Sequence, residues 1–266
     1  MSVQAGRRLR HFGWYDCGNE GGEPMRAEIN CDMGESFGLY RMGNDAEIMP
    51  HITQANVACG FHASDPGHMH QTVALAKAHG VKVGAHVSLP DLPGFGRREM
   101  KIEREEMANI ILYQIGALSA FLKQADVALS HIKPHGALYG MAAREPHIAE
   151  AVADAALVYG VPVTGLSGTL HEKVYTERGV TFLPEFFADL DYDDKGRLII
   201  TREHEAVSPD LAASRVVAAV RDRTLTTVGG KTLPVKAETI CIHSDTPNSV
   251  EIARAVHEAL GQLKTS

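Results

Sequence analysis

The sequence lacks the features that would place a protein in a membrane, outside the cell or on nucleic acid. No run of about 18 apolar residues, the length of a membrane-spanning helix, occurs in its 266 residues, and no apolar signal-peptide core follows the first arginines. The four cysteines lie far apart without a C-x-x-C pair, which favours reduced thiols. With 26 Lys and Arg against 33 Asp and Glu, the net charge is −7. We therefore expect a soluble, cytoplasmic protein with no membrane or nucleic-acid partner.

Common nucleotide-binding, calcium-binding and hydrolase motifs are also missing. Gly230-Lys231-Thr232 ends like a phosphate-binding loop, but Leu225 stands where that loop needs its first glycine. The aspartates at positions 189, 191 and 193 resemble a calcium loop, yet Asp194 replaces its glycine and Ile200 its glutamate. No H-E-x-x-H, G-x-S-x-G or G-x-G-x-x-G occurs. We therefore assign no nucleotide, calcium or hydrolase site from these motifs.

The composition is that of an ordinary globular protein. Hydrophobic residues make up 44% and charged residues 22% of the chain, close to the average of soluble domains. Residues 1–24 mix arginines with a Gly/Glu-rich stretch and show no periodicity. We expect residues 1–24 to be a disordered extension and residues 25–266 to form a single domain.

Short β-branched runs alternate with longer helical patterns, which is typical of repeated βα units around a parallel sheet. Seven strands are expected, and seven favour a barrel over an open sheet. The expected strands are Ala27–Asp32, Gln54–Cys59, Val81–His86, Ala128–Lys133, Val161–Thr164, Val180–Glu185 and Glu238–His243. The predicted fold is therefore α/β, a seven-stranded (β/α) barrel.

Capping residues and periodicity mark the connections between these strands. Asp65 before Pro66 predicts a helix start, Gly80 predicts its end, and Ser208 and Thr246 precede prolines in the same way. Apolar residues at three- and four-residue steps over 107–121 predict an amphipathic helix. Residues 189–200 are expected to form a hairpin.

Ionisable and amide side chains gather where the expected strands end. In parallel (β/α) barrels the carboxyl ends of the strands carry the reactive groups, and charged residues are rarely buried unless they are paired. Carboxylates and imidazoles there suit acid–base chemistry, and Lys133 suits an oxyanion or a phosphate. The loop containing Arg97 and Arg98 suits anion binding. The candidate site residues are Asn30, Asp32, Glu35, Asn56, His62, His86, Arg97, Arg98, Lys133, His135, Glu185, His243 and Asp245.

These strand-end sequences resemble the LamB/YcsF family, which is the family of the 5-oxoprolinase A subunits, from about Ala27 to the C-terminal helix. The resemblance is carried by the blocks Asn30–Gly38, Ala55–Pro66, Pro90–Leu92, Gly94–Arg98, Lys133–Tyr139 and Cys241–Pro247. It implies a distorted seven-stranded barrel resembling the polysaccharide deacetylase-like barrels. It also implies ATP-dependent opening of 5-oxoproline to glutamate together with two further 5-oxoprolinase subunits, B and C. One departure is Leu190, where an arginine usually follows Asp189.

The resemblance makes ATP a cosubstrate, and within that reaction the chemistry of the candidate residues suggests a role for each. Phosphorylation of the lactam oxygen would turn it into a leaving group before water attacks. Asp32, Glu185 or His62 would activate the nucleophile, while Lys133 and His135 would stabilise negative charge. The remaining candidates would bind the substrate or the nucleotide: Asn30, Glu35, Asn56, His86, Arg97, Arg98, His243 and Asp245.

Two other functions are compatible with the sequence. His62, His86 and His135 near Asp32 would suit a metal-dependent amidohydrolase or deacetylase acting alone, although their spacing matches no familiar ligand signature, so a divalent metal stays undecided. Alternatively, the chain is a non-catalytic, substrate-binding component that holds the substrate while a partner performs the chemistry.

Overall fold

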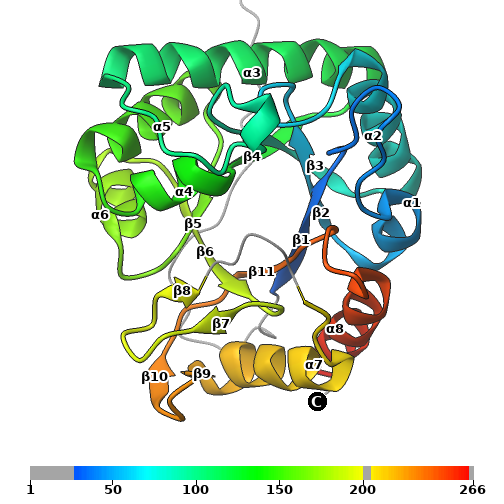
Figure 1. The fold of residues 1–266 in the computed structure, drawn as a ribbon, viewed down its shortest axis with the longest axis vertical. Helices are drawn as coiled ribbons and strands as arrows, with labels where there is room; N and C mark the ends of the chain where they lie inside the picture. The colour runs from blue at the N-terminus through cyan, green and yellow to red at the C-terminus, as the bar shows by residue number, and fades with distance from the viewer. Residues whose placement is uncertain (1–26, 200–204, 264–266) are drawn as a thin grey trace, which may run out of the picture.

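The computed structural model describes residues 27–199 and 205–263, and over them a closed barrel of seven parallel strands forms in the order β1-β11-β6-β5-β4-β3-β2 (Figure 1). The strands are β1 (Glu28–Met33), β2 (Gln54–Ala58), β3 (Lys82–Val87), β4 (Leu129–Pro134), β5 (Val163–Gly165), β6 (Phe182–Phe187) and β11 (Thr239–Ile242). The seven-stranded barrel predicted from the sequence is confirmed. The extension expected over residues 1–24 lies outside the described residues.

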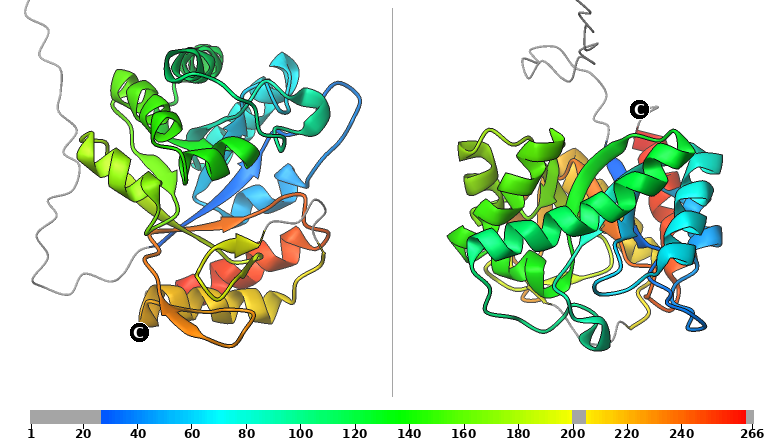
Figure 2. Two further views of the ribbon diagram at one scale, coloured as in Figure 1. Left: turned by 60° about the vertical axis from the view of Figure 1, so that its left-hand side comes forward. Right: turned by 90° about the horizontal axis from the view of Figure 1, so that it is seen from above.

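Helices surround the barrel, with α3 and α5 packed together on one side and α7 and α8 on another (Figures 1 and 2). The helices are α1 (Asp45–Ile48), α2 (Pro66–His79), α3 (Arg104–Ala125), α4 (Gly136–Ala142), α5 (Pro146–Tyr159), α6 (Leu170–Glu177), α7 (Pro209–Val217) and α8 (Ser249–Leu263). Short 3₁₀ turns occupy Met49–His51 and Leu92–Gly94, and a π turn occupies Ala218–Asp222. No helix in the described parts of the chain is both long and apolar enough to cross a membrane.

The barrel is irregular where β5 enters it. β5 has three residues, and Ile132 with Val163 is the one register pair recorded between β4 and β5. The pairing of β3 with β4 also shifts register between Val83 and Ala85. These irregularities agree with the distorted barrel that the family resemblance implies.

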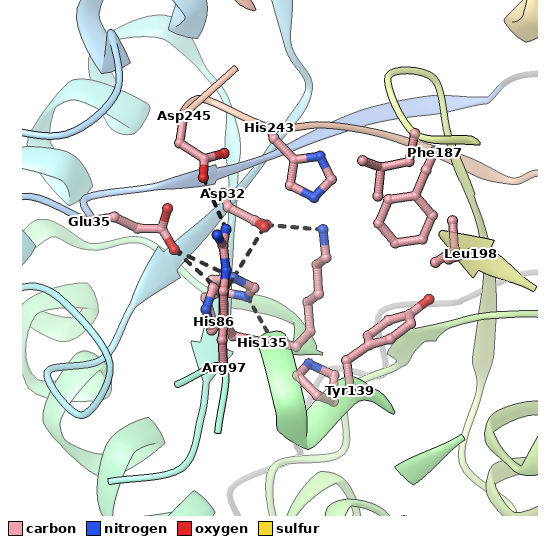
Figure 3. A pocket seen from close by; sticks show the side chains of 14 residues that line it. Asp32, Glu35, His86, Arg97, His135, Tyr139, Phe187, Leu198, His243 and Asp245 are labelled. Carbon is pink, nitrogen blue, oxygen red and sulfur yellow. Dashed lines mark hydrogen bonds and ion pairs between the residues drawn. The ribbon is translucent and has the colours of Figure 1, made fainter. Parts of the chain in front are cut away.

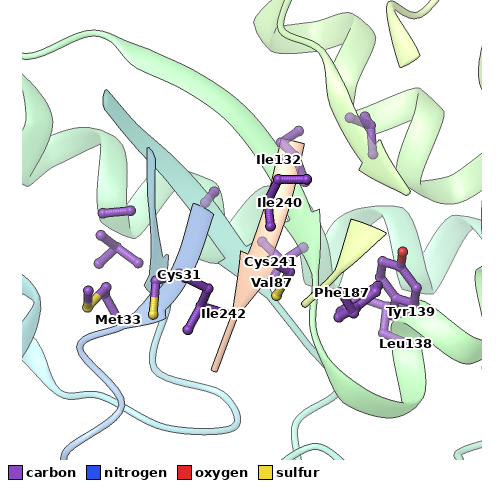
Figure 4. Close-up of a cluster of buried hydrophobic side chains, with 14 of the residues drawn as sticks. Cys31, Met33, Val87, Ile132, Leu138, Tyr139, Phe187, Ile240, Cys241 and Ile242 are labelled. Carbon is purple, nitrogen blue, oxygen red and sulfur yellow. The ribbon is translucent and has the colours of Figure 1, made fainter. Parts of the chain in front are cut away.

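Side chains alternate along the strands between an apolar outer layer and a polar interior. Outer residues such as Cys31, Met33, Ile132, Ile240 and Ile242 are buried in the core beneath the helices (Figure 4). Their sequence neighbours point into the barrel, because successive side chains of a strand face opposite sides. The inward residues include Asn30 and Asp32 of β1, Gln54 and Asn56 of β2, His131 and Lys133 of β4, and Thr239 and Cys241 of β11.

Two of the three predicted helix starts are confirmed and one is wrong. Asp65 accepts hydrogen bonds from the first backbone amides of α2, and Ser208 caps α7. Helix α8 begins at Ser249 instead of directly after Thr246. The Thr246 hydroxyl donates to Asp189, 3.3 Å away in the segment after β6. It is therefore bonded to a distant residue and does not cap a helix.

The predicted hairpin is confirmed as β7 (Asp191–Tyr192) paired antiparallel with β8 (Leu198–Ile199). The Tyr192 hydroxyl accepts a hydrogen bond from the backbone amide of Phe187 at 2.9 Å, which ties the hairpin to the end of β6. A second pair, β9 (Thr224–Thr226) with β10 (Thr232–Pro234), was not predicted. The first hairpin matters for function because it brings Leu190 and Leu198 to the site described below.

The amphipathic helix predicted over 107–121 lies within α3, and it carries one buried amide that joins helix to barrel. Gln114 accepts from the Ser88 amide at 2.9 Å and donates to the Ser88 carbonyl at 2.8 Å. The loop after β3 therefore has its backbone groups satisfied by a helix side chain instead of by water.

Replacing Gln114 by leucine is expected to lower the free energy of unfolding by at least about 2 kcal/mol, because each buried backbone group left unpaired costs about 1–3 kcal/mol. Urea denaturation followed by circular dichroism measures the change. Gln124→Leu, at an exposed position of the same helix, is the matched control and should stay within about 0.5 kcal/mol of the original protein. Equal losses in the two variants would contradict the assigned role of Gln114.

Candidate active site

A cavity of about 70 Å³ opens at the carboxyl ends of the barrel strands, where the sequence predicted a site (Figure 3). The candidates that line it are Asp32, Glu35, His86, Arg97, Lys133, His135, His243 and Asp245. Phe187, Tyr139, Leu190 and Leu198 add apolar surface. The cavity therefore combines charged groups of both signs with an apolar wall, as small-molecule sites commonly do.

Lys133 is the buried cation of this site. Its ammonium lies 3.0 Å from a carboxylate oxygen of Asp32 and 3.0 Å from one of Glu185, and only 2% of the residue is exposed. Burial disfavours the charged ammonium, but the nearby carboxylates outweigh burial and raise the pKa of Lys133 well above its usual value. The ammonium is therefore protonated and sits against the cavity, 5.5 Å from the centre of the Phe187 ring.

Two amides predicted to bind substrate or nucleotide lie beneath the cavity instead. Asn30 accepts from Lys133 at 3.1 Å and donates to Thr239 at 2.8 Å. Asn56 donates to Asn30 at 2.8 Å and to Asp32 at 2.9 Å. Because these side chains are buried and bonded to other protein groups, their position suits orienting Asp32 and Lys133 and does not suit contact with a ligand.

A second cluster, formed by Glu35, His62, His86 and His135, borders the same cavity. The Glu35 carboxylate lies 3.1 Å from Nε2 of His62, 3.6 Å from Nδ1 of His135 and 3.8 Å from Nε2 of His86. Nδ1 of His135 lies 2.9 Å from Nε2 of His86. All four residues are buried, and their facing atoms lie within 4.8 Å of one another, close enough to share a metal ion.

Two imidazoles of this cluster pack against each other and against Phe95. The rings of His62 and His135 are stacked with centres 3.9 Å apart, and Phe95 packs edge-on against both. Burial lowers the pKa of His62 and that of His135 well below the usual range. Both rings are therefore neutral, the state in which imidazole nitrogens bind metals.

The two neighbouring arginines of the predicted anion-binding loop pair with different carboxylates, and one of the two lines the cavity. Arg97 pairs with Asp245 at 2.9 Å, stacks over Phe95 and lines the cavity. Arg98 points away and binds both carboxylate oxygens of Asp91, so it is not brought to the cavity. The reason is that Asp91 caps the 3₁₀ turn of the same loop and binds Arg98 there.

His243, which lines the cavity, forms a pair with Asp189. Asp189 accepts from the His243 ring at 3.0 Å and from the His243 backbone amide at 2.8 Å. Burial opposes the imidazolium charge, but Asp189 outweighs burial and raises the pKa of His243 well above its usual value. The next residue, Leu190, is buried and forms part of the cavity wall.

Glu185 and His62 are adjacent to the site without lining the cavity. Glu185 is fully buried behind Lys133, and His62 is fully buried behind Glu35. Sequence reasoning assigned no role to Phe187, Cys241 or Tyr139, although strand periodicity places Phe187 on the face of Glu185 and Cys241 on that of His243. Tyr139 follows His135 by four residues, one turn along α4.

Comparison with known proteins identifies close relatives over nearly the whole described chain. The profile of the LamB/YcsF family matches residues 27–266. A 5-oxoprolinase A subunit from Thermus thermophilus is 46% identical over 242 residues, which cover 90% of this chain and 97% of that protein. The lactam utilization protein lamB of Emericella nidulans is 44% identical over 242 residues, covering 90% and 95%. The crystal structure of a lactam utilization protein from Thermus thermophilus superposes with a TM-score of 0.84 at 44% identity, covering 90% and 97%.

Replacing Asp189 by asparagine is expected to return the pKa of His243 toward the ordinary histidine value of about 6.5, because the carboxylate that favours the imidazolium is removed. Titration of the histidine ring signals by NMR measures this change. His171, whose pKa burial lowers to about 4, is the internal reference and should titrate alike in both proteins. A His243 titration that the substitution leaves unaltered would show that Asp189 does not hold the charge.

Proposed function

The chain belongs to the LamB/YcsF family, and we propose that it is the A subunit of an ATP-dependent 5-oxoprolinase, the subunit that binds the lactam and cleaves it. The overall reaction converts 5-oxoproline, ATP and two water molecules to glutamate, ADP and phosphate. The relatives named as 5-oxoprolinase A subunits and as a lactam utilization protein support the substrate class. The observation that carries the proposal is the convergence of Asp32, Lys133, Arg97 and His243 on one small cavity.

Cleaving a lactam requires the stabilisation of negative charge on its carbonyl oxygen. Amide resonance makes that carbonyl a poor electrophile, and coupling to ATP supplies the driving force: the lactam oxygen would take the terminal phosphoryl group of ATP and release ADP. Water would then add to the activated carbon, and the C–N bond would break as the ring nitrogen takes a proton, leaving an acyl phosphate. A second water would hydrolyse the acyl phosphate to glutamate and phosphate. Lys133 is fixed by its two carboxylate contacts and would stabilise charge on the oxygen or on the phosphoryl group without reorganising. Arg97 and the His243 imidazolium are further cations at the cavity for the substrate carboxylate.

Of the three groups predicted to activate water, the geometry favours Asp32. Asp32 lines the cavity, whereas Glu185 and His62 lie behind its wall. One Asp32 oxygen faces Lys133 at 3.0 Å and the other faces His86 at 3.2 Å. In this role Asp32 would take a proton from the attacking water, while Glu185 would position Lys133.

ATP and partner subunits complete the proposal. The naming of the relatives as A subunits supports an assembly, and we assign the two further subunits, B and C, to the reaction. The sequence has no glycine-rich phosphate loop, so ATP is proposed as a cosubstrate of the assembly. We place the reaction in the cytoplasm, where ATP is supplied and where thiols such as those of Cys31, Cys59 and Cys241, all free in this structure, stay reduced.

Replacing Lys133 by glutamine, or Asp32 by asparagine, is expected to lower glutamate release from 5-oxoproline by about 10²–10⁴-fold in the complex reconstituted with its partner subunits. Enzyme-coupled glutamate detection with and without ATP measures the rate. Lys231→Gln is the matched control, since Lys231 is an exposed lysine paired with Asp194 away from the cavity, and it should keep the original rate.

Near-normal rates in both active-site variants, with assembly verified by gel filtration, would refute the catalytic assignment. They would favour the alternative in which a partner performs the chemistry, especially if 5-oxoproline still binds to the variants. Glutamate release by the isolated chain without ATP would instead support an amidohydrolase acting alone.

A further inference from the structure

Four adjacent strands of the barrel, β1 to β4, each place one potential metal ligand at the same point. Glu35 follows β1, His62 lies in the loop after β2, His86 lies in β3 and His135 follows β4. None of these side chains is more than 6% exposed. A buried set with three imidazoles is unusual unless the rings have partners, because polar groups without partners are costly to bury.

Hydrogen bonds to backbone carbonyls fix which nitrogens carry the protons in two of these rings. Nδ1 of His86 lies 3.0 Å from the Lys133 carbonyl, and Nε2 of His135 lies 2.9 Å from the Phe95 carbonyl. A carbonyl oxygen only accepts, so Nδ1 of His86 and Nε2 of His135 are the protonated nitrogens. In neutral rings, Nε2 of His86 and Nδ1 of His135 then hold lone pairs, and these two atoms face each other at 2.9 Å.

Two lone pairs at that distance repel each other unless a cation, either a proton or a metal ion, lies between them. The buried histidine His171 shows the contrasting arrangement, in which one ring nitrogen accepts from the Leu166 amide at 3.0 Å and the other lies 3.0 Å from the Tyr139 carbonyl. His171 is thus satisfied as one donor and one acceptor. His86 and His135 instead show the arrangement typical of metal-bound imidazoles, with one nitrogen donating to a backbone carbonyl and the other facing the cluster, where Nε2 of His86 also lies 3.2 Å from Asp32.

The distances between the facing atoms also fit a common ion. Ligand atoms about 2.0–2.2 Å from a tetrahedral metal lie about 3.3–3.6 Å from one another. Four of the six separations between the facing atoms are 2.9, 3.1, 3.6 and 3.8 Å, on either side of that range, and all six are at most 4.8 Å. We propose that Glu35, His62, His86 and His135 bind one divalent transition-metal ion of the Zn²⁺ class.

The donor set selects the class of metal. Imidazole suits zinc, cobalt, nickel and copper, whereas magnesium and calcium prefer sites made of oxygen atoms. The neighbouring group of Asp32, Cys241 and His243 also lies close together, but the Lys133 ammonium already contacts Asp32 and Cys241, each at 3.0 Å. A second cation there would meet that charge, so the histidine cluster is the favoured site.

The proposed ion would border the reaction cavity, since Glu35, His86 and His135 line it and Asp32 lies 3.2 Å from His86. Bound there, it would supply Lewis-acid chemistry next to the carboxylate assigned to water activation. The metal site goes beyond the proposed function and does not depend on it, because metal binding is measured without lactam, ATP or partner subunits.

The test uses the full-length chain without an affinity tag, stripped with a chelator and then titrated with Co²⁺ and with Zn²⁺. Bound metal is counted by mass spectrometry, and the visible d–d bands of Co²⁺ report its coordination. We expect one ion per chain, a Co²⁺ spectrum typical of low-coordinate nitrogen and oxygen ligands, and an increase in the melting temperature with Zn²⁺ but not with Mg²⁺.

His86→Gln and Glu35→Gln should each weaken Co²⁺ binding by at least about 100-fold, more than the roughly 10–100-fold typical of losing a group outside the ligand shell. His257→Gln is the matched control, because the His257 ring lies against that of His51 outside the cluster, with centres 5.9 Å apart. This control should bind Co²⁺ as the original protein does.

The proposal is overturned if the original chain gives neither Co²⁺ bands nor a Zn²⁺-dependent melting shift, or if His86→Gln binds as tightly as the original. Loss of binding in His257→Gln alone would place the ion at a surface histidine pair and also overturn it. Should the cluster variants fail to fold, ¹⁵N NMR of the original protein decides the question, since Zn²⁺ must shift Nε2 of His86 and Nδ1 of His135. If Zn²⁺ leaves the ¹⁵N chemical shifts of these two nitrogens unchanged, the two rings share a proton and the metal proposal is overturned.

Discussion

The buried ammonium of Lys133 is the constraint on which the rest of the site depends. An uncompensated charge inside a protein costs several kcal/mol. Asp32 from β1 and Glu185 from β6, each 3.0 Å from the ammonium, offset that cost. Asn30 adds a contact at 3.1 Å. Three strands are thereby fixed to one another through a single cation.

Asp32 connects this lysine centre to the histidine cluster. One of its oxygens contacts Lys133, and the other contacts His86. Burial disfavours the Asp32 carboxylate, but the neighbouring His86 and Lys133 outweigh burial and hold the pKa of Asp32 well below its usual range. A negative charge therefore lies between the Lys133 ammonium and the His86 ring, which suits a site that polarises a carbonyl and delivers water to it.

The barrel was predictable because strand periodicity, capping residues and the position of polar residues at strand ends all depend on local sequence. The orientation of individual side chains was not. Arg97 and Arg98 are adjacent in the sequence, yet only Arg97 reaches the cavity, because Asp91 binds Arg98. Asn30 and Asn56 look like ligand-binding residues in sequence, but partners more than twenty residues distant satisfy them beneath the cavity. The start of α8 was misplaced for the same reason, since Thr246 bonds to distant Asp189.

The central claim is that the cavity beside Lys133 holds the lactam during its cleavage. A crystal structure of the chain with 5-oxoproline bound, from a preparation that releases glutamate with its partners, tests this claim most directly. The account predicts the lactam ring against Phe187, its carbonyl oxygen toward Lys133 and its carboxylate toward Arg97 or His243. A 5-oxoproline molecule bound elsewhere, with this cavity unchanged, would contradict it.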